Sequence, residues 1–339
     1  DRRSVSANAA LLLTPSVYTV DCNGAKTTGN LVYLWTVFVN GKVEPALVSQ
    51  SLDPSKFRLP AYSLTPLTTY DIMVSVTNVL SSRTSTATVT VTVQQGALVA
   101  QIGGGSTQSI LVDGSLTLDA SSSFDQDIPT RTGAAAGLSF VWTCSQTAPV
   151  VSSTCPLTMS EASLQTLVLS ASSAAASTTA SVTVTVSDGL SRTRSVSVLV
   201  TAQDSSAPQV AITSTAQSVT SINVNSRLAL AASVTVQSSC TAQWSVDDAS
   251  VVLANRALTP VSTVIPVGTT RALNLVIAAA GLPERSSLVF TLACGSSSAA
   301  ITVTTNGPPL PGVFAVTPSS GVELTTSFAF SASFWSDSD

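Results

Sequence analysis

The stretch "TASVTVTVSDGLSRTRSVSVLVT" (residues 179–201) decides the fold. Both of its halves alternate small apolar residues with Ser and Thr, which is the period of two typical of a β-strand with one buried face. A short polar segment separates the halves, so the stretch predicts two adjacent strands joined by a turn. The same arrangement is found in "TYDIMVSVTNVLSSRTSTATVTVTV" (69–93) and in "SLVFTLACGSSSAAITVTT" (287–305).

A tryptophan-bearing strand precedes each of these pairs. The segments "LVYLWTVFV", "LSFVWTC" and "CTAQWSV" place Trp35, Trp142 and Trp244 at intervals of 107 and 102 positions. These intervals match β-sandwich domains of about 100 residues with a buried Trp on a central strand. We therefore predict that the three tryptophans are core residues of three consecutive units.

The predicted architecture is all-β, with the sandwiches arranged end to end. Short joints marked by Gly or Pro lie near positions 95, 205 and 308, and joints of this length predict a semi-rigid rod. The segment "MSEASLQTLVLSASSAAAS" (159–177) leaves a short helix open as an alternative to strand. The predicted domains are 1–95, 96–204, 205–307 and 308–339, the last being either the start of a further unit or an inter-subunit docking segment.

Composition excludes several classes of protein. Only 9% of the residues are charged and the net charge is −4, so the chain has no basic patch for nucleic acid. The longest apolar run, "ALNLVIAAAGL" (272–282), is too short for the roughly 20 residues of a membrane span. The start, "DRRSVSANAALLLTPS", is interpreted as the first strand of a processed chain or of a segment cut from a longer one.

Catalytic chemistry is not expected. The chain has no His, which removes the commonest general base and leaves too few ligands for a zinc site. "IGGGS" (102–106) has glycines but neither a Lys nor a helix start, so it is not a phosphate-binding loop. We predict no catalytic residues, no cofactor and no enzyme activity.

The corner "SLTLDASSSFDQD" (115–127) allows two interpretations. Asp125 and Asp127 could supply carboxylate oxygens to calcium, a hard cation that takes six to eight oxygen ligands. Asp and Ser side chains also cap their own backbone in turns, which explains the same residues without a metal. The turn is the favoured interpretation, because only two carboxylates lie in the loop and the other units have no equivalent.

The chain has five cysteines, and they suggest two disulfides. Cys144 follows Trp142 and can close a local loop to Cys155, whereas Cys240 and Cys294 lie on strands that we expect to be neighbours. Chain entropy assigns these bonds about 3 and 4 kcal/mol. Oxidised pairs indicate an extracellular or cell-surface location. Cys22 has no partner within its unit, so it is either a buried free thiol or an intermolecular bridge.

The residues also resemble a known family. "ALVAQIGGGSTQSILVDGSLTLDASSSFDQD" (97–127), followed by "LSFVWTC" (138–144), resembles the opening of polycystic-kidney-disease (PKD) repeats and of the receptor-for-egg-jelly (REJ) region. "FRLPAYSLTPLTTYDIMVSV" (57–76) is similar to the REJ segment in which a leucine-proline-rich strand precedes a Tyr-led strand, and "NGPPLPGVFAVTPSSGVELTTSFAFSASFWSD" (306–337) resembles the start of another unit. The resemblance implies tandem immunoglobulin-like sandwiches in large extracellular proteins.

Two functions follow as expectations. The first is a structural one: a building block of a cell-surface or matrix fibre, which associates with itself or with other extracellular glycoproteins. The alternative is an adhesion or recognition ectodomain of a polycystin-like or REJ-type receptor that binds protein or carbohydrate. The Pro-rich joint offers Pro308, Pro309 and Pro311 as sites of covalent O-glycans after hydroxylation, or else as a stiff linker.

Overall fold

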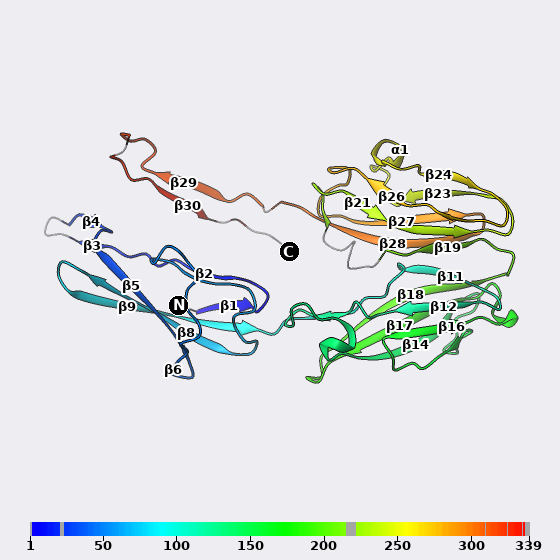
Figure 1. The fold of residues 1–339 in the computed structure, drawn as a ribbon, viewed down its shortest axis with the longest axis horizontal. Helices are drawn as coiled ribbons and strands as arrows, with labels where there is room; N and C mark the ends of the chain where they lie inside the picture. Colours follow the sequence, from blue (N-terminus) through cyan, green and yellow to red (C-terminus); the bar gives the residue numbers. More distant parts are fainter. Residues whose placement is uncertain are drawn as a thin grey trace. The chain divides into compact units, whose positions relative to one another are not determined.

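The computed structural model describes residues 2–20, 24–214, 222–308, 310–323, 325–333 and 335. It is almost entirely β (Figure 1) and falls into two compact units. Unit 1 comprises Asp1–Val99, Ser123–Leu138 and Val186–Arg194, and unit 2 comprises Ala100–Ser122, Ser139–Thr185 and Ser195–Asp339. The all-β fold class predicted from the alternating strands is confirmed, whereas the four domain boundaries stay a prediction.

Unit 1 is built on a five-stranded sheet in the order β1-β9-β8-β5-β6. On the central strand, β8, the inner side chains are buried because apolar residues occupy every second position. A much smaller second layer, the strand pair β2–β7, covers part of the inner face, and β3 pairs with β4. The bounds are β1 Arg2–Ser6, β2 Leu11–Leu13, β3 Thr19–Val20, β4 Lys26–Thr27, β5 Leu31–Val39, β6 Lys42–Val43, β7 Phe57–Leu59, β8 Thr69–Asn78 and β9 Arg83–Gln94.

Unit 2 contains a long sheet in which strands of the second and third predicted sandwiches are joined. Its order is β14-β17-β18-β11-β28-β27-β23-β24, with β20 pairing β28. The tip of the hairpin between β17 and β18 belongs to unit 1. The bounds are β11 Thr107–Leu111, β14 Ser139–Ala148, β17 Thr179–Ser187, β18 Thr193–Gln203, β20 Ile222–Asn223, β23 Cys240–Val246, β24 Ser262–Ile265, β27 Ser287–Cys294 and β28 Ser297–Asn306.

Smaller sheets pack as second layers. One has the order β12-β16-β15, another β19-β22-β25, and β21 pairs with β26. Their bounds are β12 Ser115–Asp119, β15 Thr158–Met159, β16 Thr166–Ser170, β19 Gln209–Ile212, β21 Leu228–Leu230, β22 Ala232–Thr235, β25 Thr270–Ala272 and β26 Leu275–Ile277. The remaining elements are β10 Leu98–Val99, β13 Phe124–Asp125, η1 Gly133–Ala136, η2 Ser173–Ala175, α1 Leu253–Arg256, β29 Val313–Thr317 and β30 Ala329–Ser333.

The segment 159–177 forms strand rather than α-helix. It contains β16, whose alternate residues Leu167 and Leu169 are fully buried, and it ends in the short 3-10 turn η2. The alternation of buried positions decides this outcome, because a period of two places every second side chain on one face of a sheet.

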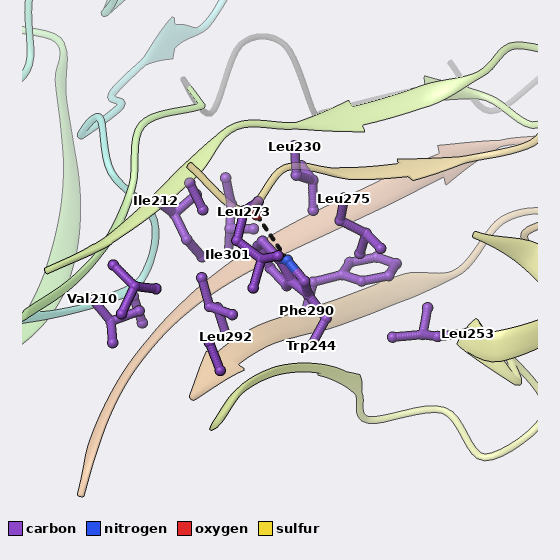
Figure 2. Close-up of a cluster of buried hydrophobic side chains, with 14 of the residues drawn as sticks. Val210, Ile212, Leu230, Trp244, Leu253, Leu273, Leu275, Phe290, Leu292 and Ile301 are labelled. Atoms are coloured by element: carbon purple, nitrogen blue, oxygen red, sulfur yellow. Dashed lines mark hydrogen bonds between the residues drawn. The ribbon is translucent and has the colours of Figure 1, made fainter. Parts of the chain in front are cut away.

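The core of the third sandwich centres on Trp244 and Phe290 (Figure 2). The indole of Trp244 is enclosed by aliphatic side chains from both layers, and its Nε1 donates a hydrogen bond to the carbonyl oxygen of Leu273 at 3.0 Å. Trp142 is equally buried in the second sandwich and its Nε1 donates to Leu164. Trp35 is only half-buried, and its ring packs 5.3 Å from that of Phe57.

The pairing of β11 with β28 joins the two sandwiches of unit 2 at "IGGGS" (102–106). Thr107 pairs with Ala300, and the N–H of Ser106 donates to the carbonyl oxygen of Ala300 at 2.8 Å. Gly105 has a φ of +90°, and a Cβ at this position would collide with that same carbonyl oxygen. Gly105 therefore serves a close backbone approach.

We expect Gly105→Ala to destabilise unit 2 by about 1–3 kcal/mol, because alanine is strained at positive φ and has no room beside Ala300. Chemical denaturation followed by circular dichroism measures this loss. Gly189→Ala is the matched control, since open space surrounds Gly189. Its stability should stay within about 0.5 kcal/mol of the parent or rise slightly. Equal effects of the two substitutions would contradict the assigned role of Gly105.

Candidate functional site

The most elaborate polar cluster in the described residues surrounds Arg192 in unit 1. Its guanidinium donates from Nε to Asp188 at 2.7 Å, from Nη2 to Asp125 at 2.5 Å and from Nη1 to Asp127 at 3.3 Å. Nη1 also donates to the carbonyl oxygen of Gly96 at 2.6 Å. One side chain thereby ties together the segment that follows β9, the loop after β13 and the turn between β17 and β18. We call these five residues the Arg192 cluster.

Local turns place the members of the cluster. Oδ1 of Asp188 accepts the backbone N–H groups of Leu190 and Arg192, both at 2.9 Å, which folds the turn so that the Arg192 side chain points back to the carboxylate. Oδ1 of Asp125 accepts the N–H of Asp127 at 2.9 Å. The carboxylate of Asp127 accepts the N–H of Gly96 at 2.9 and 3.0 Å. Asp188 and Asp125 thus cap their own turns, and Asp127 links its turn to Gly96.

The charged side chains of the cluster are largely shielded from water, which strengthens the interactions between them. The side chain of Arg192 is 18% exposed, and those of Asp125, Asp127 and Asp188 are 5%, 10% and 10% exposed. Burial lowers the pKa of Arg192, but hydrogen bonds to Asp188 and Asp125 raise it above its usual value overall. The guanidinium therefore keeps its charge.

For Asp188, burial alone would raise the pKa. Hydrogen bonds from the Arg192 side chain and from the backbone of Arg192 and Leu190 outweigh burial, so the pKa of Asp188 lies below its usual value. A carboxyl whose pKa is lowered by folding stabilises the protein above its unfolded pKa, and this contribution disappears as the pH falls through the lowered pKa. The Arg192–Asp188 pair is therefore fully effective at neutral pH.

The two interpretations of the serine–aspartate corner can now be compared. Asp125 and Asp127 both face the guanidinium of Arg192, so a cation of the chain itself already lies against these carboxylates. Oδ1 of Asp119 accepts the N–H of Ser121 at 2.8 Å, which is a further self-capped turn. Within the described part of the chain, no group of three or more His, Cys, Asp or Glu residues is arranged to hold a metal ion. The geometry is that of a cross-linked turn.

The cysteines form the two disulfides that the sequence suggests. Cys144 bonds to Cys155, with Cα atoms 5.2 Å apart, and Cys240 bonds to Cys294, with Cα atoms 5.8 Å apart. The second disulfide joins neighbouring strands β23 and β27, where Cys294 is fully buried. Cys22 lies outside the described residues.

The other predicted positions do not gather into a site. Pro308 and Pro311 are exposed in the segment after β28, whereas Pro309 lies outside the described residues. Recognition of carbohydrate or protein by loops would favour exposed aromatic side chains, but Phe57 is buried against Trp35 and Phe124 is half-buried, whereas Tyr62 is exposed. Arg192 is not among the residues that the sequence pattern singled out. Its signal was the turn "SDGLSR" (187–192), in which an Asp and an Arg lie four positions apart.

Fold and site together define a tandem β-sandwich protein with immunoglobulin-like domains. The family model of the REJ domain matches residues 18–339, and the chain belongs to this family. REJ domains occur in extracellular regions and, like immunoglobulin-like domains, are a non-catalytic kind of domain. The two disulfides agree with an extracellular location. No helix among the described residues is long and apolar enough to cross a membrane.

Comparison with curated proteins found no match. Among solved structures, a three-Ig-domain segment of titin is 8% identical over 90% of this chain and 94% of that one, with a TM-score of 0.22. A segment of human CDH23 is 13% identical over 90% of this chain and 97% of its own, with a TM-score of 0.27.

A nucleoside hydrolase-related hypothetical protein from Saccharophagus degradans, associated with carbohydrate metabolism, is 15% identical over 32% of this chain, with a TM-score of 0.26. The match spans 26% of the length of that protein. At these TM-scores the likenesses carry no argument about function.

Proposed function

We propose that this chain is a structural segment of an extracellular fibre or matrix glycoprotein, in which tandem sandwiches provide length and a strand-mediated contact links one copy to the next. One observation carries the proposal. The hairpin β29–β30 pairs with no other strand of the described residues, and Phe314 on β29 and Phe330 on β30 are 62% and 69% exposed.

The exposed face of this hairpin offers a contact surface for a second copy of the chain. A two-stranded sheet is at best marginally stable in water, and an apolar face of this kind marks a contact surface. The rings of Phe314 and Phe330 stack with centroids 6.2 Å apart, so the exposed apolar surface is continuous across both strands. Exposed Pro308 and Pro311 lie beside the hairpin, where glycans of such a glycoprotein would be attached without entering a core.

Light scattering of the purified chain over a wide concentration range, with negative-stain microscopy of the same samples, tests this function. We expect the mass to rise with concentration and linear particles to appear. A chain that stays monomeric throughout would overturn the proposal.

A second candidate function is adhesion or recognition at the cell surface, as an ectodomain that binds protein or carbohydrate. Membership of the REJ family supports it. The positions of Phe57, Tyr62 and Phe124 do not add to this support, because they form no exposed aromatic cluster on the loops. The structural function is therefore preferred.

A further inference from the structure

The inner face of the first sheet is covered along only part of its length. On β9, the inward residues Val91 and Val93 are fully buried, whereas Ser85 and Ala87 are exposed. Ser85 pairs with Val76 and Ala87 pairs with Val74, and paired residues lie on the same side of a sheet. Since Val74 and Val76 face the core, the exposed Ser85 and Ala87 also lie on the core side.

The equivalent last strand of the third sandwich shows no such change. On β28, the inward residues Ala299, Ile301 and Val303 are buried from one end to the other, because the second layer there comprises β19, β22 and β25 together with β21 and β26. In unit 1 the second layer is the short pair β2–β7 and the pair β3–β4. Among the described residues, the second layer of the first sandwich therefore covers only part of the first sheet.

Two grooves mark the missing part. One, of about 220 Å³, is lined by Leu13, Trp35, Val74, Ala87 and Val89, with Arg3 at its wall. The other, of about 780 Å³, is lined by Tyr18, Leu31, Val76, Leu80 and Ser85, with Arg83 at its wall. We call the inner side of β9 from residue 83 to residue 89, with these two grooves, the open face. Apolar and polar side chains contribute to it in nearly equal share, and it carries positive charge at its margin.

The hairpin β29–β30 carries an apolar face that is exposed. The register pairs Phe314 with Ala332 and Val316 with Phe330, so these four side chains share one face. In the part of the chain that the structure describes, no other strand pairs with the hairpin, and Phe314 and Phe330 on this face are exposed. Its connecting loop carries the acidic residue Glu323.

We propose that the hairpin of one copy packs on the open face of a second copy and supplies the layer that the first sandwich lacks. This inference rests on the proposed function and names the surface that receives the hairpin. The dimensions agree: five-residue strands extend about 17 Å, and residues 83–89 of β9 extend about 23 Å. The charges agree as well, because Arg3 and Arg83 border the face that would receive a hairpin bearing Glu323.

Pairing of two hairpins with each other explains the structure less well. It would be an isologous contact, which closes at a dimer and leaves the open face of both copies uncovered. The hairpin-to-face contact is heterologous, so every copy presents one free hairpin and one free face, and a chain of copies grows. In this arrangement the hairpin and the open face cover each other.

Complementary variants of the full chain test the proposal. The double substitution Phe314→Ser with Phe330→Ser removes the apolar rings of the hairpin. Ala87→Glu places a charged side chain on the open face. We expect each variant alone to be monomeric by light scattering and their equimolar mixture to form a pair that does not grow. Thr86→Glu is the matched control for Ala87→Glu, because Thr86 is the adjacent exposed residue on the opposite side of β9, and this control should assemble like the parent.

A photo-crosslinking amino acid at position 330 tests the same contact without relying on a disabled variant. In a mixture of isotope-labelled and unlabelled chains, we expect crosslinks between copies from position 330 to residues 13–20 or 83–89. The same amino acid at position 52, where Leu52 is fully exposed, is the control and should not reach those segments.

The outcomes separate the two proposals. If the parent assembles while Ala87→Glu assembles equally well, or if the crosslinks from position 330 fall elsewhere or only within one chain, the hairpin-to-face contact is wrong and the fibre function rests on another surface. If the parent never assembles, the proposed function itself fails.

Discussion

Replacing Trp244 with alanine is expected to lower the free energy of unfolding of the third sandwich by about 3–5 kcal/mol, the range for deleting a large buried aromatic side chain. Trp244 is 2% exposed and lies between the two layers of that core (Figure 2). Its removal leaves a cavity and also deprives the carbonyl oxygen of Leu273 of its donor. A buried acceptor without a partner adds about 1–3 kcal/mol to the cost.

Guanidinium denaturation followed by circular dichroism measures this effect. Val264→Ala, on the edge strand β24 of the same sandwich, is the control because Val264 is exposed. It should change stability by no more than about 0.5 kcal/mol. A loss below about 1 kcal/mol for Trp244→Ala would contradict the position of this residue as the centre of the core.

The second large effect is expected from Arg192→Met, which removes the charge and keeps an unbranched apolar stem. The three carboxylates of Asp125, Asp127 and Asp188 then lose their counter-charge while remaining mostly buried. Removing one partner of a buried ion pair typically costs about 3–5 kcal/mol, because the remaining charge is uncompensated. We expect a loss of this size in thermal or chemical unfolding of unit 1.

Two further variants show whether charge or geometry is responsible. Arg192→Lys keeps the charge but not the planar fork, so it should recover only part of the loss. Arg194→Met alters an exposed arginine two residues away and should be nearly neutral. If Arg192→Met were as mild as Arg194→Met, the cluster would be an incidental surface feature.

The extent to which sequence predicts this structure differs between its parts. Alternation along 179–201 predicts β17 and β18 because a strand with one buried face must place an apolar residue at every second position. The spacing of Trp142 and Trp244 predicts their burial for a related reason: a large ring fills the space between two layers. Neighbouring strands likewise explain why Cys240 meets Cys294.

Contacts between distant segments were beyond such reasoning. Arg192 lies 96 positions from the carbonyl oxygen of Gly96 that it binds, and nothing in a local pattern brings these residues together. The same holds for the pairing of Thr107 with Ala300. The glycines of 102–106 lack the pattern of a phosphate loop, but nothing in the local sequence shows that Gly105 lets two backbones approach.

The hydrogen bonding of β11 to β28 bears on how such chains diversify. Loss or duplication of a single repeat by recombination would strip one of these strands of its neighbour and present a bare sheet edge to other molecules. Selection should therefore transmit the second and third repeats as an inherited pair.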